Sequence, residues 1–199
     1  KQAHDNAVAS AHKIAAKYNC HTEHSNAVAG FASELFDKLK NFHGIEAEKK
    51  ILLELAAILH SCGQYVNVRN HSQCSFDLIK NMDIFGLTHD QILETAYISG
   101  YGEPNTYETN DFGFFALSEE KRLEISKLVA IFRLANSLDK SKHQKIEITK
   151  IKISGDKLEI RATAKENALL EKWSFDESAI FFKEVFGLSP ELLLRSNLF

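Results

Sequence analysis

The sequence predicts a mainly α-helical fold followed by a small α+β C-terminal unit that contains a β-hairpin. Two prolines and nine glycines in 199 residues favour long, uninterrupted elements. Apolar residues recur at helical spacing through the first two-thirds of the chain, and near residue 146 the spacing changes to two-residue alternation. We therefore expect a helical body over residues 1–143 and an α+β unit over residues 144–199 packed on it.

The first part of the body carries three predicted helices. Helical spacing of apolar residues predicts the first over residues 7–18. Thr22 is placed to cap the second, which should end near Gly44. Residues 46–62 are apolar on most faces, which is typical of a helix in the centre of a core. We expect this central helix to stop at Gly63.

The rest of the body is predicted to alternate helices with one long loop. A short helix is expected over residues 71–80, and another over residues 88–98 with a cap-like start at Thr88. Residues 100–117 contain glycine, asparagine and proline among aromatic residues, which indicates a loop. Ser118 and the two glutamates after it predict the start of a long helix that runs to Leu138.

The C-terminal unit is predicted from alternation around a turn. Apolar residues occupy alternate positions on either side of Gly155–Asp156, which predicts a hairpin over residues 146–162. A hairpin alone is marginally stable, so we expect a helix over residues 167–186 to pack on it. Residues 191–194 are apolar enough to predict a third strand.

Composition and charge narrow the classes of function. The formal net charge of −3 disfavours unaided binding to nucleic acid or to an anionic membrane. No apolar run is long enough to span a membrane, and no signal peptide is predicted at the start. Three cysteines are too few and odd in number for a disulfide framework, so we expect reduced thiols and a cytoplasmic protein. We expect the chain to be the excised C-terminal part of a longer protein.

The most distinctive string ends the apolar segment and reads Leu-His-Ser-Cys-Gly over residues 59–63. His24 precedes it, His71 follows it, and Arg-Leu-Ala-Asn-Ser-Leu-Asp occupies residues 133–139. This order resembles the HD superfamily of metal-dependent phosphohydrolases. More narrowly, almost the whole chain resembles the C-terminal HD-like domain of the exopolyphosphatase / guanosine pentaphosphate phosphohydrolase (Ppx/GppA) family. The resemblance implies an HD-like helical body.

This sequence departs from the family pattern where metal ligands are expected. Ser61 replaces the aspartate of the His-Asp pair, and Asn136 replaces an aspartate of the long helix. Ser72 and Cys74 stand where the family has histidines, and a later family histidine falls near Gly102. Carboxylates offset the desolvation of a divalent cation, whereas serine and asparagine offer only dipoles. We therefore expect a degenerate metal site, with no metal and no catalytic residue in this chain.

Two alternatives stay open at this stage. A residual site of His24, His60, His71 and Cys74 would make the chain a metal-dependent phosphohydrolase with unusual ligands. In the second alternative, the chain is a regulatory interaction module of an inactive parent. His60 taken alone is typical of a core histidine that bonds a backbone carbonyl.

The resemblance also implies partners. The family's phosphate-cleaving chemistry belongs to an N-terminal actin-like module that uses Mg²⁺, and this chain would contribute homodimer contacts and a basic surface. That surface would guide polyphosphate, or a guanosine pentaphosphate, toward the module. Its candidate residues are Arg69, Arg133, Lys140 and Lys142. A buried salt bridge is the alternative for Arg133, since it lies in an apolar helix.

Overall fold

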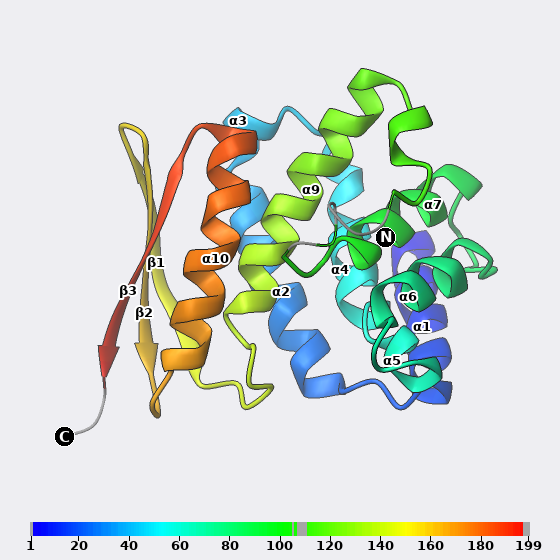
Figure 1. The fold of residues 1–199 in the computed structure, drawn as a ribbon, viewed down its shortest axis with the longest axis horizontal. Helices are drawn as coiled ribbons and strands as arrows, with labels where there is room; N and C mark the ends of the chain where they lie inside the picture. Colours follow the sequence, from blue (N-terminus) through cyan, green and yellow to red (C-terminus); the bar gives the residue numbers. More distant parts are fainter. Residues whose placement is uncertain (1, 105, 107–110, 197–199) are drawn as a thin grey trace.

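The computed structural model of the chain describes residues 2–104, 106 and 111–196 (Figure 1). Its fold is mainly α-helical, with a small three-stranded sheet at the C-terminal side, as the sequence predicts. The α-helices are α1 (Gln2–Lys17), α2 (Thr22–Lys38), α3 (Lys40–His43), α4 (Lys50–Leu59), α5 (Cys62–Val66), α6 (His71–Lys80), α7 (His89–Gly100), α9 (Glu119–Ser137) and α10 (Leu169–Phe186). Two 3₁₀ turns are η1 (Ala47–Lys49) and η2 (Phe114–Ala116).

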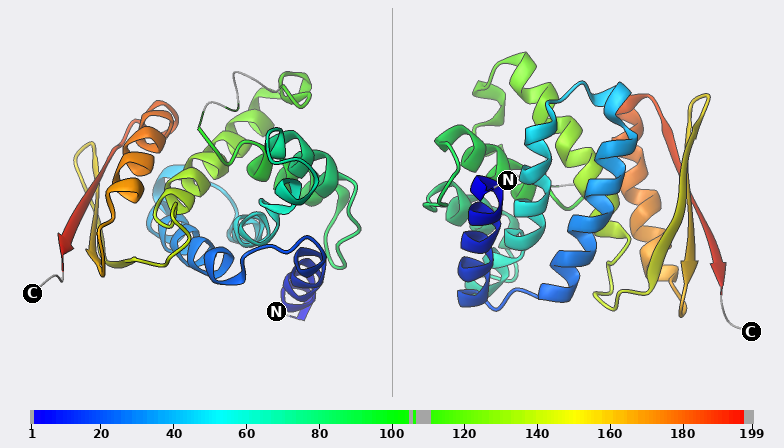
Figure 2. Two further views of the ribbon diagram at one scale, coloured as in Figure 1. Left: turned by 60° about the horizontal axis from the view of Figure 1, so that its bottom comes forward. Right: turned by 180° about the vertical axis from the view of Figure 1, so that it is seen from behind.

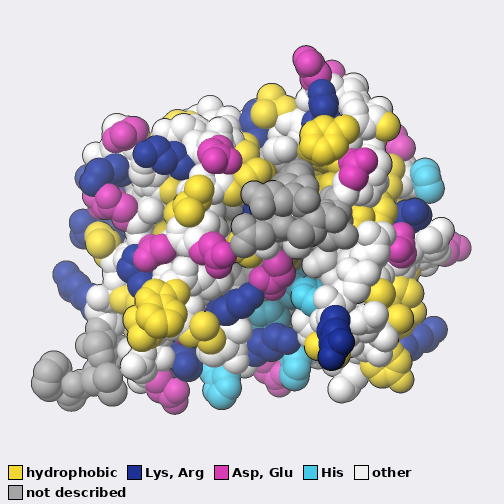
Figure 3. All heavy atoms as spheres, viewed as in Figure 1, with side chains coloured by type: hydrophobic (Ala, Val, Ile, Leu, Met, Phe, Trp, Pro, Cys, Tyr) yellow, Lys and Arg dark blue, Asp and Glu magenta, His cyan; other side chains and the backbone are white. Residues whose placement is uncertain are grey.

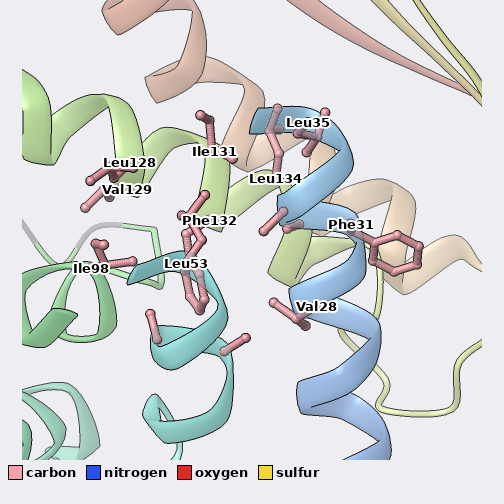
Figure 4. Close-up of a cluster of buried hydrophobic side chains, with 14 of the residues drawn as sticks. Val28, Phe31, Leu35, Leu53, Ile98, Leu128, Val129, Ile131, Phe132 and Leu134 are labelled. Carbon is pink, nitrogen blue, oxygen red and sulfur yellow. The ribbon is translucent and has the colours of Figure 1, made fainter. Parts of the chain in front are cut away.

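Helix α4 lies at the centre of the body, as its apolar sequence predicts. It packs against α1, α2, α7 and α9, which together surround it (Figure 2). Leu53 of α4 meets side chains of α7 and α9, among them Ile98 and Phe132, in the buried cluster of Figure 4. A helix that is apolar on most faces is stable only when neighbours cover each face, and this arrangement provides that cover.

Helix boundaries agree with prediction where a local cap sets them. Thr88 accepts a hydrogen bond from the backbone N–H of Gln91 and completes a capping box, and α7 then runs to Gly100. The Ser118 side chain accepts from the Lys121 N–H at the start of α9. Gly44, at φ +63°, follows α3 in the left-handed conformation that ends helices.

Two boundary predictions were wrong. Thr22 is the first residue of α2, because the carbonyl of His21 already accepts the first helical hydrogen bond and His21 takes the N-cap position. The central helix does not stop at Gly63: it breaks after Leu59, and α5 continues through Gly63 to Val66. The predicted loop over residues 100–117 includes residues 105 and 107–110, which lie outside the described residues.

Gly63 serves close packing between α5 and α6. A Cβ atom on Gly63 would lie 2.1 Å from the carbonyl oxygen of His71 and 2.4 Å from the backbone nitrogen of Ser75. The Ser75 hydroxyl accepts from the Gly63 N–H at 3.0 Å and donates to the His60 carbonyl at 2.7 Å. Ser75 therefore joins α6 to the break between α4 and α5.

The C-terminal unit is a βαβ arrangement attached to a hairpin. Strands β1 (Ile146–Ser154) and β2 (Lys157–Ala164) are antiparallel, and β3 (Ser189–Ser196) pairs parallel to β2. Helix α10 connects β2 to β3 and packs on α9 and β3, so it lies between the sheet and α9, while β1 also contacts α2 (Figure 1). The predicted third strand is confirmed and is longer than expected. The predicted domain boundary at residue 143 falls in the connection between α9 and β1 and stays a prediction.

Within the described residues, no single helix is long and apolar enough to cross a membrane.

Candidate functional site

A polar pocket of about 320 Å³ opens at the end of the body where α2, α4, α6 and α9 approach one another. Figure 3 shows histidine side chains in a hollow of this face, with basic and acidic side chains beside them. The pocket joins residues that lie far apart in sequence. They come from four helices (α2, α5, α6 and α9) and from the connections that follow α4, α7 and α9. Its lining is His24, His60, Gln64, His71, Glu103, Asn136, Lys140 and Lys142.

His24 is held by a buried aspartate. Its Nδ1 donates to Oδ2 of Asp139 at 2.8 Å, and Asp139 also accepts from the backbone N–H of Gln144 at 2.7 Å and from its side-chain amide at 3.0 Å. Burial would raise the pKa of Asp139, but these hydrogen bonds outweigh it, so the pKa lies below its ordinary value. An ionised Asp139 accepts the Nδ1–H of His24 and so fixes the orientation of its ring.

His60 lies next to His24 at the end of α4. The two ring centroids are 5.3 Å apart, and the ring of Phe132 packs against His60 from α9. His60 Nδ1 donates to the carbonyl oxygen of Ala57 at 3.0 Å, the backbone bond that a core histidine is expected to make. Burial and the neighbouring His24 lower the pKa of His60 to about 4, so it is neutral at pH 7.

Glu103 supplies the one carboxylate among the described residues that line the pocket. Its Oε2 accepts from Nζ of Lys140 at 2.6 Å, and its Oε1 accepts from the side-chain amide of Asn136 at 3.2 Å. Burial would raise the pKa of Glu103, and the ammonium group of Lys140 outweighs it, so the pKa is below its ordinary value. Glu103 is therefore ionised, and its charge is matched by Lys140.

Lys142 reaches the pocket from a tight turn after α9. Lys142 and Gln144 have φ of +60° and +47°, which is unusual for residues that carry a Cβ. The backbone N–H of Lys142 donates to the Asp139 carbonyl at 2.8 Å, and Gln144 holds the Asp139 carboxylate. The turn that fixes Asp139 thus also places Lys142 at the pocket.

The residues present do not fit a divalent metal site. His24, His60 and His71 share the pocket, but Cys74 lies outside its lining, so the structure brings together three of the four alternative ligands. Across the part of the chain that the structure describes, no group of three or more His, Cys, Asp or Glu side chains is arranged to hold a metal ion.

The other positions of the predicted degenerate motif lie in different surroundings. Asn136 lines it and bonds Glu103, whereas Ser61 is buried at the start of α5. Ser72 lies half-buried on α6. Gly102 packs against Phe132, whose ring would lie 2.7 Å from a Cβ atom at this position. A side chain at residue 102 would therefore displace the aromatic ring that supports His60.

Comparison with protein families places this pocket in a known domain. Residues 8–178 match the family model of Ppx/GppA phosphatase, domain III. The chain belongs to the Ppx/GppA phosphatase family. The matched range includes every described residue that lines the pocket. A search of curated proteins found no match.

The basic residues predicted for this Ppx/GppA domain separate into three settings. Lys140 and Lys142 line the pocket, and Arg69 is exposed in the connection between α5 and α6. Arg133 is only 4% exposed. Its guanidinium group donates to the carbonyl of Tyr101 at 2.7 Å and to the Thr106 hydroxyl at 3.1 Å, and it lies 4.6 Å from the ring centre of Phe181. The guanidinium group of Arg133 is thus held within the protein interior.

Sequence reasoning missed Gln64, Glu103 and Asp139 as parts of the site. Asp139 carried a usable signal, because it follows Asn136 by three residues at a helix end and so shares its face. Glu103 carried no such signal in the sequence, since it lies in an irregular segment. Its partners Asn136 and Lys140 are 33 and 37 residues away.

Proposed function

We propose that this Ppx/GppA domain binds inorganic polyphosphate and assists assembly within a phosphoanhydride hydrolase, without catalysing the cleavage itself. The parent would release terminal phosphate from polyphosphate or guanosine pentaphosphate in an N-terminal actin-like module that uses Mg²⁺. The pocket carries the proposal, because it combines two lysines and three histidines with a single carboxylate.

The charges of the pocket favour an anionic ligand. Lys140 matches the charge of Glu103, and Lys142 adds a further positive charge. The histidines add nitrogen atoms that bond phosphate oxygens or phosphate hydroxyl groups. Because the surplus of positive charge is small and open to solvent, we expect weak binding that falls as salt is raised.

Ser61 and Asn136 support the non-catalytic part of the proposal. A hydrolytic metal centre needs carboxylates to hold its cations and to tune the bound water. The carboxylate of Glu103 in the pocket is already bonded to Lys140, and that of Asp139, buried behind His24, is bonded to His24.

Charge reversal at Lys142 tests the binding proposal. Tripolyphosphate and long-chain polyphosphate are titrated into the chain at low salt by calorimetry. Lys142→Glu should weaken binding about tenfold, or about 1.4 kcal/mol, because an attraction becomes a repulsion at the ligand. Lys183→Glu is the matched control, since Lys183 is exposed on α10 and does not line the pocket.

Two results would overturn the proposal. One is no heat of binding for the native chain at low salt. The other is an equal loss of affinity in Lys142→Glu and Lys183→Glu, which would show a response to net charge alone.

A further inference from the structure

Two thiols from distant parts of the chain lie in contact. Cys20 lies in the connection between α1 and α2, and Cys62 is the first residue of α5. Their Sγ atoms are 3.4 Å apart, although the residues are 42 positions apart in sequence. In Figure 1 the connection from α1 to α2 runs along the same end of the molecule as α5. The fold therefore positions the pair.

The two thiols differ in exposure. Cys62 is fully buried, whereas Cys20 is half-buried and accessible to a small reagent. The backbone N–H of Cys20 donates to the carbonyl of Ala15 at 3.2 Å, and Asn19 before it has φ +51°. This turn holds the Cys20 side chain toward Cys62. The more accessible thiol is thus the one that lies in a connection rather than in a helix.

The surroundings of Cys20 favour its thiolate. The pKa of Cys20 is lowered to about 7, chiefly by its hydrogen bond with Cys62. Burial acts in the opposite direction, and a hydrogen bond from Ser61 and the charge of Lys142 lower the pKa further. A thiolate is the form that attacks oxidants, and a low pKa with partial exposure is typical of redox-sensitive cysteines.

We propose that Cys20 and Cys62 form a reversible dithiol–disulfide site, in which Cys20 reacts with a hydroperoxide and Cys62 closes the disulfide. The Sγ–Sγ distance must shorten from 3.4 Å to about 2.0 Å. Rotation of the Cys20 side chain, with a small shift of the connection that carries it, supplies this movement. The inference is independent of the function proposed for the pocket.

The chemistry balances with hydrogen peroxide as oxidant. The Cys20 thiolate attacks one peroxide oxygen, the O–O bond breaks, and the departing hydroxide takes up a proton to become water. Cys20 is then a sulfenic acid. The Cys62 sulfur attacks the Cys20 sulfur as its thiol loses a proton, the S–O bond breaks, and the hydroxide leaves with that proton as water. Two thiols and one peroxide thus give one disulfide and two waters.

Peptide mapping of the native chain tests this site, with Cys74 as an internal control. The folded chain is treated with hydrogen peroxide near pH 7 and then unfolded in denaturant while its remaining thiols are alkylated. It is digested without reductant. We expect a cross-linked peptide pair that contains Cys20 and Cys62, with Cys74 alkylated, and complete reversal by dithiothreitol. The same product should form in Cys74→Ser.

Cys20→Ser should abolish the cross-link and leave Cys62 and Cys74 alkylated. If that variant does not fold, the map of the native chain alone decides. The proposal fails if peroxide oxidises Cys74 ahead of the pair, if disulfides join separate chains, or if Cys20 passes to its sulfinic acid while Cys62 stays a thiol.

Discussion

At the residue scale, the link between Asp139 and His24 makes stability depend on pH. The pKa of Asp139 is lowered in the folded chain, so the stability it contributes is fully present above about pH 4, the ordinary pKa of aspartate. That contribution is lost as the pH falls from there through the lowered folded pKa. Asp139→Asn should reduce the free energy of unfolding by about 2 kcal/mol at pH 7, because charged hydrogen bonds to His24 and Gln144 are weakened.

Urea unfolding at pH 7 and at pH 3 measures this difference. The gap between Asp139→Asn and the native chain should narrow at pH 3, because the Asp139 carboxyl group of the unfolded chain is largely protonated there. A gap of equal size at both pH values would contradict an ionised Asp139.

The site residues show what a single sequence conveys at this scale. Seven positions were predicted to belong to one motif. His24, His60, His71 and Asn136 line the pocket, whereas Ser61, Ser72 and Cys74 do not. Glu103 was not predicted, because its position depends on the fold of an irregular segment and on partners in α9. Cys20 and Cys62 were predicted to be separate reduced thiols, and only the packing of a connection against α5 reveals that they touch.

At the element scale, predictions succeeded where the deciding contacts are local. Thr88 with Gln91, and Ser118 with Lys121, are three residues apart, so the sequence itself displays these caps. Gly63 was misinterpreted as a helix stop because its contacts are with α6, eight or more residues away. A glycine required for close approach and a glycine that ends a helix look alike in sequence.

Gly63 and Gly30 form a matched pair of tests. Gly63→Ala should reduce the free energy of unfolding by about 2–4 kcal/mol, because its Cβ would overlap backbone atoms of His71 and Ser75. Gly30→Ala in α2 should raise it by about 0.5–1 kcal/mol, since a Cβ there meets nothing within 4 Å and alanine favours the helix. Thermal or urea unfolding measures both variants. Equal effects of the two substitutions would show that α5 and α6 separate easily.

At the scale of the whole molecule, the order of helices and strands could be predicted, but their packing partners could not. The alternation after Ile146 indicated a hairpin, and the apolar α10 segment indicated a helix on it. The parallel pairing of β3 with β2 follows only when α10 crosses between them and packs on α9. That packing leaves one side of α10 facing outward.

We propose a homodimer contact on the outward side of α10. Leu169, Trp173 and Ile180 are spaced to share one helix face, and all three are exposed, Trp173 by 64%. A two-fold dimer uses the same patch on both copies, so this apolar stripe can pack against the same stripe of a second chain.

Trp173→Glu should therefore convert a dimer to a monomer in sedimentation velocity runs at micromolar concentration. Phe85→Glu, which alters an aromatic residue that is 70% exposed outside α10, should leave the dimer intact. A native chain that sediments as a monomer would contradict this contact, and so would a dimer that survives Trp173→Glu.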